Sequence, residues 1–312
     1  MNLNSSPVIG IPRAMLYYRY GTLWEKFFEA LGVTYVMSPP SNREILQTGA
    51  SIAVDETCLS AKMFMGHVQY LLDKCDLIFI PRYSSFSHNE VFCTRFEGLY
   101  DQMRNVFRTD AHRFITCNID EKQGHSEKQA FEELGRSLGY SVADSRKAYM
   151  QAVKVEKRRR KMLSRQTEEL SRKKGIRILL AGHPYSVSDP YLGKPILDYL
   201  QKAGVTVLRA DTADPEAARR ACAKFSPTCR WAMSKELVGG TMLWKDKADG
   251  IILLSAFPCG PDSMTNELLT RRIKDVPVLN LVLDTQTGTA GIETRLESFL
   301  DIIHLKKEGE LP

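Results

Sequence analysis

The sequence predicts an α/β protein with two doubly wound, flavodoxin-like parallel-sheet domains joined by a long helical segment. Three observations predict this fold. Apolar strand-like runs alternate with helix-like segments, the pattern occurs in both halves, and a long polar stretch with few breakers separates the halves. Continuous apolar runs between helices are typical of parallel strands that are covered on both faces. The predicted domains are 1–125 and 176–312, and 126–175 is the predicted helical connection.

The first half starts with a short apolar run, Val8–Pro12, which predicts a strand. Tyr17–Leu31 has helical periodicity, because its apolar residues recur at intervals of three and four, and Gly32 is expected to end the helix. The remaining strands of this half are predicted at Val33–Met37, Leu77–Pro81 and Phe114–Ile119.

The second half repeats the alternation. Its strands are predicted at Ile176–Ala181, Val205–Leu208, Gly250–Ala256 and Val276–Leu283. Between the halves, the polar stretch Ser126–Lys174 is predicted to be helical and contains the basic run Lys157–Lys161. This run can be a solvated helix face, a nucleic-acid contact or a docking site for an acidic electron-transfer protein. No nucleic-acid recognition motif accompanies the charge, which favours the solvated face.

Composition and motifs exclude several classes of protein. Of the 312 residues, 43% are hydrophobic and 26% are charged, with a net charge of +6, which is typical of a globular chain. No apolar run of about 20 residues could span a bilayer, and the start shows no secretion signal, so we expect a cytoplasmic protein. GxGxxG, GxxxxGK[ST], GxSxG and HExxH are all absent, so dinucleotide binding and ATP hydrolysis at such motifs have no support.

The cysteines carry the first specific signal. An odd number without a CxxC pair argues against a disulfide framework and against a zinc ribbon. The seven are Cys58, Cys75, Cys93, Cys117, Cys222, Cys229 and Cys259. The simplest interpretation of most of them is as small buried hydrophobic residues.

Three cysteines fall where ligands bind in doubly wound folds, beyond the carboxyl ends of strands or at helix starts. Cys259 follows the strand Gly250–Ala256 directly and precedes a helix predicted at Met264–Lys274, whose positive end favours a thiolate. Cys93 is expected in the loop after Leu77–Pro81, and Cys58 lies near a predicted helix start. Their spacing alone does not show that the three meet.

The other candidates are less specific. Cys117 either reaches the same crevice from the end of its strand or is buried there. His183 follows a strand at its carboxyl end and is therefore a site candidate, whereas His67, on an apolar helix, is expected to be a core residue. Asp262 or Ser263 is expected to cap the helix after Cys259.

Seven blocks of the sequence, in order, resemble the domain found attached to, or encoded alongside, ATP-dependent activators of 2-hydroxyacyl-CoA dehydratases. The resemblance runs from about Val8 to Ile303. The blocks are Ile9–Ala14 with Leu16–Tyr18; Val36–Asn42; Asp55–Cys58 with Lys62, Gly66 and His67; Cys93 with Phe96, Gly98, Leu99 and Asp101; Gly182–Tyr185 with Asp189–Tyr191; Cys259–Ser263; and Gly291–Phe299.

The resemblance implies a 4Fe–4S cluster held by Cys58, Cys93 and Cys259 between two α/β domains. Because four cysteines are the usual ligand set, one iron would be open to water, substrate, a sulfide bridge or Cys117. Related proteins include double-cubane reductases, so an 8Fe–9S double cubane is the alternative cofactor. Lys62 and His183 are the candidate side chains for contact with a substrate or with cluster sulfur.

The implied function is low-potential electron transfer, or reduction or dehydration of a small substrate at the cluster. The electron would come from an ATP-dependent activator or from a donor of ferredoxin or flavodoxin type. The alternative is a non-catalytic electron carrier or accessory protein for the activator, and a third interpretation is a cluster-free remnant with buried cysteines. Neither nucleic acid nor membrane is an expected partner, and a homodimer is an expected assembly.

Overall fold

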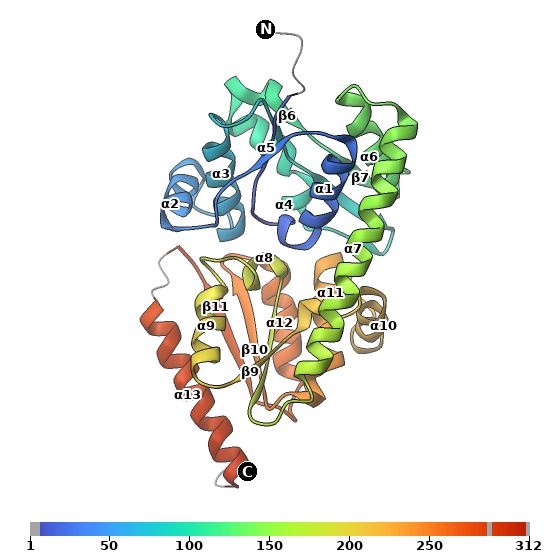
Figure 1. Ribbon diagram of the computed structural model, residues 1–312. Coiled ribbons are helices and arrows are strands. Elements are labelled where there is room, and N and C mark those ends of the chain that lie inside the picture. Colours follow the sequence, from blue (N-terminus) through green and yellow to red (C-terminus); the bar gives the residue numbers. More distant parts are fainter. Residues whose placement is uncertain (1–6, 286–288, 310–312) are drawn as a thin grey trace. The chain divides into compact units, whose positions relative to one another are not determined.

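The computed structural model describes residues 7–285 and 289–309. The first six residues, on which the expectation about a secretion signal partly rests, lie outside the described residues. The chain divides into two compact units, and Figure 1 shows the sheet and helices of each. Unit 1 comprises residues 1–159 with 230–232, and unit 2 comprises residues 160–229 with 233–312.

Unit 1 is built on a four-stranded sheet in the order β2-β1-β3-β6. The strands are β1 (Ile9–Ile11), β2 (Tyr35–Met37), β3 (Leu77–Phe79) and β6 (Phe114–Ile115). All three pairings are parallel, which confirms the predicted parallel sheet. The chain adds β2 on one side of β1 and β3 on the other, so the switch point of a doubly wound sheet lies beside β1.

Helix α1 (Tyr17–Leu31) has the bounds that the periodicity predicts. Its apolar stripe is buried, and the rings of Trp24 and Phe28 contact Phe79 of β3 edge-on, with centroids 5.3 and 5.5 Å away. Gly32 ends the helix with a φ of 72°, a left-handed conformation that glycine adopts without a steric penalty.

Helices α2 and α3 approach each other closely because glycines lie between them. A Cβ atom on Gly49 would lie 1.8 Å from the carbonyl oxygen of Lys62, and one on Gly66 would lie 2.0 Å from that of Ile45. The helical elements that follow α1 in unit 1 are α2 (Arg43–Ile52), α3 (Leu59–Leu71), α4 (Thr94–Glu97), α5 (Leu99–Val106), η1 (Arg108–Arg113), η2 (Glu121–Gln123) and α6 (Glu127–Ser137).

A second, three-stranded sheet in unit 1 was not predicted. It consists of β4 (Arg82–Ser87), β5 (Glu90–Val91) and β7 (Asn118–Asp120), in the order β5-β4-β7. The single strand predicted at Phe114–Ile119 is therefore wrong: β6 pairs with β3, and β7 pairs with β4. Backbone hydrogen bonds from Ile80 to Ile115 and from Arg82 to Cys117 continue the pairing across the junction of the sheets.

Unit 2 repeats the strand order of the first sheet. Its strands are β8 (Arg177–Gly182), β9 (Thr206–Arg209), β10 (Gly250–Ala256) and β11 (Val278–Leu283), all parallel, in the order β11-β10-β8-β9. Numbered along the chain, the strands of both units run 2-1-3-4, as in flavodoxin-like sheets. The predicted fold class is confirmed.

The helix after Cys259 begins earlier than predicted. It starts at Gly260, so Cys259 is the N-cap and neither Asp262 nor Ser263 caps the helix. Pro261 explains the early start, since its fixed φ suits a first turn that needs no amide hydrogen there. The helical elements after β8 are α8 (Pro184–Val187), α9 (Lys194–Lys202), η3 (Ala210–Thr212), α10 (Pro215–Phe225), α11 (Ala232–Trp244), η4 (Lys245–Lys247), α12 (Gly260–Arg272) and α13 (Thr289–Glu308).

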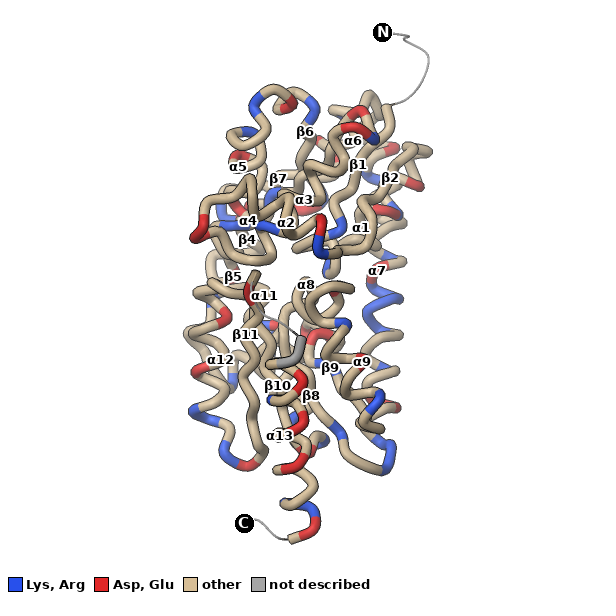
Figure 2. Tube along the Cα trace, turned by 90° about the vertical axis from the view of Figure 1, so that its left-hand side faces the viewer, with Lys and Arg blue, Asp and Glu red and all other residues tan. Residues whose placement is uncertain are grey.

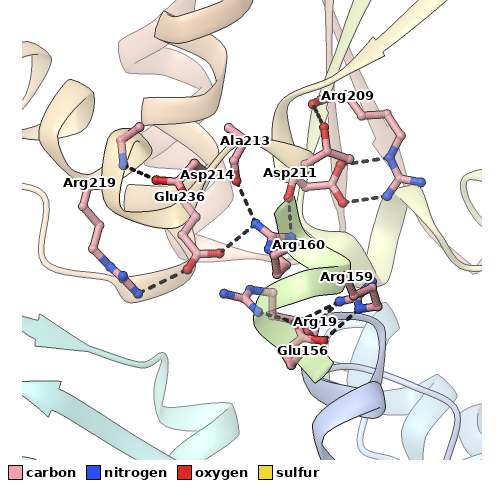
Figure 3. Close-up of polar contacts among 12 residues, drawn as sticks. Arg19, Glu156, Arg159, Arg160, Arg209, Asp211, Ala213, Asp214, Arg219 and Glu236 are labelled. Carbon is pink, nitrogen blue, oxygen red and sulfur yellow. Dashed lines mark hydrogen bonds and ion pairs between the residues drawn. The ribbon is translucent and has the colours of Figure 1, made fainter. Parts of the chain in front are cut away.

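The polar stretch between the halves is helical, as predicted, and forms α6 and α7 (Val142–Leu170). Polar side chains of α7 make buried contacts within each unit, as Figure 3 shows. In unit 1, Glu156 lies 3.3 Å from Arg19 and 2.8 Å from Arg159. In unit 2, Arg160 donates to the carbonyl oxygens of Asp211 and Ala213 at 2.8 and 3.0 Å. No helix of the described ranges is long and apolar enough for a membrane span.

Candidate functional site

Each of the three cysteines predicted as ligands occupies the N-cap position of a helix. Cys58 caps α3, Cys93 caps α4 and Cys259 caps α12. All three are half-buried, and none of them forms a disulfide bond with a described residue. The first amides of a helix have no carbonyl partner within it and carry the positive end of its dipole, so an anionic sulfur is stabilised there.

Cys58 lies beside a turn that is stabilised by a hydrogen bond from the side chain of Lys62. Its carbonyl oxygen accepts the amides of Ala61 and Lys62 at 2.9 and 3.0 Å, which starts the helix. The ammonium of Lys62 donates back to the carbonyl oxygen of Asp55 at 3.0 Å. Lys62 was predicted as a contact to substrate or sulfur; the structure places it one turn after Cys58 and bound to the preceding turn.

Cys93 follows the hairpin of β4 and β5 rather than β3 directly, which corrects the predicted position. Its sulfur accepts the amide of Arg95 at 3.5 Å, the one cap of the three in which an amide donates to sulfur. The amide of Val91, just before it, donates to the carbonyl oxygen of Arg230 at 2.9 Å. A hairpin and this distant segment together fix the start of α4.

In unit 2, His183 and Asp262 come together at the switch point of the sheet. His183 follows β8 and caps α8, and Asp262 lies in the first turn of α12, after β10. Because β8 and β10 are paired neighbours, the two helix starts lie at one sheet edge. His183 Nε2 lies 2.6 Å from Asp262 Oδ1, and the side chains are 2% and 1% exposed.

The surroundings of this pair are polar and buried. The contact has the distance of an ion pair, and neither carboxylate oxygen of Asp262 accepts a hydrogen bond from the described residues. His183 Nδ1, Asp262 Oδ2, Ser186 Oγ and Asn266 Oδ1 are buried and have no hydrogen-bond partner among the described residues. Leaving such an atom unpaired costs about 1–3 kcal/mol, and unpaired buried polar groups of this kind are typical of functional sites.

Sequence reasoning selected His183 but gave Asp262 only a capping role. The signal that would have found the pair is positional. Both residues follow the carboxyl ends of neighbouring strands, and a doubly wound sheet binds its ligands there. The pair places an imidazole and a carboxylate, groups that can act as general acid or base, in a water-poor environment.

The remaining cysteines have structural surroundings. Cys117 is 1% exposed, and burial raises the pKa of its thiol, which favours the protonated form. Burial also raises the pKa of the Cys75 thiol, to about 11, and this thiol donates to the carbonyl oxygen of Leu71. Cys222 belongs to the hydrophobic core of unit 2, and Cys229 packs against it.

No three His, Cys, Asp or Glu side chains gather into a metal-binding group within the described part of either unit. Cys58, Cys93 and Cys117 belong to unit 1, and Cys259 belongs to unit 2. The predicted convergence of Cys58, Cys93 and Cys259, and the predicted role of Cys117 as a fourth ligand, therefore stay predictions.

Comparison with known proteins gives a family match. Residues 8–212 match the family described as "CoA enzyme activase uncharacterised domain". The match covers more than half of the chain and includes Cys58, Cys93 and His183, whereas Cys259 and Asp262 lie beyond it. A search of curated proteins finds no match.

Proposed function

The chain belongs to the family of the CoA enzyme activase uncharacterised domain, and from that premise we propose that it is an iron–sulfur protein of the 2-hydroxyacyl-CoA dehydratase type. It takes up a low-potential electron from an ATP-dependent activator and uses it to reduce or dehydrate a small substrate. The proposed cofactor is a 4Fe–4S cluster, with the double cubane as the alternative.

The observation that carries this proposal is the setting of the three cysteines. Cysteine thiolates are the donors that iron–sulfur clusters use, and Cys58, Cys93 and Cys259 are half-buried rather than enclosed. Each stands at a helix start whose amides stabilise negative charge on sulfur. The donor chemistry of these residues therefore fits the cluster. When bound, the cluster supplies one-electron chemistry whose potential depends on exposure and on hydrogen bonds to sulfur.

The His183–Asp262 pair supports substrate chemistry over a simple electron carrier. Dehydration moves protons as well as electrons, and a buried imidazole beside a carboxylate can hold a proton. A carrier has no use for such a pair. His183 would donate or accept the proton, and Asp262 would orient the imidazole. Lys62, bound to the turn before Cys58, would keep that turn in place.

The exposed cations of α7 support an acidic electron donor as partner. Figure 2 shows basic residues along this helix. No ion pair joins any of them to a carboxylate of the described ranges, and opposite charge steers association. The exposed residues are Lys147, Lys154, Lys157, Arg158, Lys161 and Arg165. Reduction by the donor should therefore slow as ionic strength rises.

Anaerobic reconstitution tests the cofactor. The full chain should bind about four iron and four sulfide, or about twice that for a double cubane. The variants C58S, C93S and C259S should bind less iron or show altered EPR spectra. C75S and C229S are matched controls, because these cysteines are also half-buried, and they should behave like the parent chain. Equal iron and EPR spectra in all five variants would contradict the proposal. C117S tests the predicted fourth ligand in the same way.

A second experiment separates the enzyme from the carrier. The reduced protein is mixed anaerobically with a 2-hydroxyacyl-CoA ester, and the EPR spectrum and the ester are analysed. Loss of water from the ester, dependent on Asp262, supports the enzyme. An unchanged ester and an unchanged spectrum, with electrons passed on to a dye, support the carrier.

A further inference from the structure

The loop after β1 in unit 1 carries an arginine that no acidic residue of the described ranges neutralises. Arg13 follows β1, and its amide donates to Ser38 Oγ, just after β2, at 2.8 Å. β1 and β2 pair in parallel, with Ile11 opposite Met37, so both loops leave the same edge of the sheet. Met15 in the loop after β1 has a φ of 50°, a conformation that non-glycine residues hold mainly where the surroundings enforce it.

The guanidinium of Arg13 is half-buried and has no ion pair with a carboxylate in the described part of the chain. Its Nε is buried without a hydrogen-bond partner. The nearby aromatic ring, that of Tyr17, has its centroid 5.9 Å from Cζ, at the outer limit of a cation–π contact. A buried N–H of a guanidinium that lacks an acceptor is costly, so this side chain is prepared for an anion that the chain itself does not supply.

His67 of α3 lies close enough to this guanidinium for the positive charge to act on it. The imidazole is 0% exposed, its Nε2 lies 3.0 Å from Ser41 Oγ, and its Nδ1 is buried without a partner. Burial, and secondly the charge of Arg13, lower its pKa to about 3, so the ring is neutral near pH 7. A neutral imidazole offers one N–H donor and adds no charge.

Hydroxyl groups complete the cluster. Ser38 Oγ accepts from the amide of Arg13, so its own hydrogen is available to a ligand. Ser41 contacts His67. Ser60 lies two helical turns before His67 on the same face of α3, and its buried hydroxyl has no partner within the described ranges. The group thus joins one unneutralised cation to several neutral donors.

We propose that Arg13, Ser38, Ser41 and His67 form a binding site for an oxyanion, the phosphate or carboxylate group of a small molecule, at the carboxyl edge of the sheet of unit 1. A guanidinium binds such groups with charge-assisted hydrogen bonds, and hydroxyl and N–H donors take the remaining oxygens. In doubly wound sheets this edge is where ligands bind. The site uses none of the cysteines and is independent of the proposed cluster.

Calorimetric titration of the iron-free full chain at low ionic strength tests the site. Inorganic phosphate and acetate are the two probes. We expect saturable binding of at least one of them, and the tighter one assigns a phosphate or a carboxylate ligand. Arg13→Gln should weaken that binding at least about tenfold, in line with the loss of hydrogen bonds to a charged group. Ser41→Ala should weaken it by a smaller factor.

Arg136→Gln is the matched control, because it removes the same charge from an exposed position of α6 in the same unit. It should leave the affinity unchanged. Circular dichroism shows whether each variant is folded, and Ser41→Ala decides the question if Arg13→Gln is not. No saturable binding to the parent chain, or equal loss in R13Q and R136Q, would overturn the site. Iron binding is measured separately, so this failure is distinct from failure of the proposed function.

Discussion

His183 Nε2 lies 2.6 Å from Asp262 Oδ1, and this contact joins the first turns of α8 and α12. The residues are far apart in the sequence, and the pairing of β8 with β10 brings them together. Asp262 lies one turn after Cys259, so the pair also restrains the segment that bears this cysteine. In unit 1, Arg13 and Ser38 occupy the corresponding edge. Both units therefore concentrate unusual polar groups at the carboxyl edge of their parallel sheets.

Asp262→Asn should lower the free energy of unfolding by about 1–3 kcal/mol, because His183 loses a charged partner in a buried position. Asp198→Asn is the control, since Asp198 pairs with Lys194 at an exposed site and such pairs contribute about 0–1 kcal/mol. Urea denaturation at pH 7 measures both. Equal losses in the two variants would show that the buried contact contributes no more to the free energy of unfolding than the exposed ion pair does.

Arg160→Met should destabilise unit 2 by about 1–3 kcal/mol, since it leaves two buried carbonyl groups without their donor, while Glu236 keeps its ion pair with Arg219. Arg158, two positions earlier on α7, is exposed, and Arg158→Met should change stability by about 0.5 kcal/mol or less. Thermal and urea unfolding compare the two variants. A small effect of Arg160→Met would mean that the buried network of Figure 3 is replaceable by apolar packing.

Alkylation should label the thiols in a defined order. Cys58, Cys93 and Cys259 are half-buried and should react with iodoacetamide in the native, cluster-free chain. Cys117 and Cys222 are buried, and burial raises the pKa of the Cys117 thiol, so these two should react only after unfolding in urea. Mass spectrometry of tryptic peptides gives the order. Early labelling of Cys117 in the folded chain would contradict its placement in the interior.

His67 should cause the free energy of unfolding to decrease as the pH is lowered. Its pKa is about 3 in the folded chain against an ordinary value of 6.5, so below pH 6.5 the unfolded chain binds a proton that the folded chain does not. The free energy of unfolding then falls by up to about 1.4 kcal/mol per pH unit until pH approaches 3. Between pH 6.5 and 5 the parent should lose about 1–2 kcal/mol more than His67→Gln. Parallel urea curves at both pH values test this, and an identical pH dependence would be inconsistent with a buried neutral imidazole.

The sequence by itself determined the helices and the class of sheet. Tyr17–Leu31 is helical with the predicted bounds. The hydrogen bonds of an α-helix join residues only four positions apart, so the periodicity of its apolar residues can be recognised within a short segment of sequence. The buried runs at β8 and β10 likewise identified parallel strands. Position after strands or near helix starts was enough to select Cys58, Cys93 and Cys259 as candidate ligands.

Only the tertiary structure decided what depends on distant pairing. The strands β4, β5 and β7 are short and partly polar, and β4 pairs with β7 from far along the chain, so the sequence pattern did not predict this sheet. Because of this sheet, Cys93 follows the hairpin of β4 and β5 and does not follow β3 directly. The contact of His183 with Asp262 and that of Arg13 with Ser38 follow from the strand order 2-1-3-4, because strand pairing joins segments that the linear sequence keeps apart.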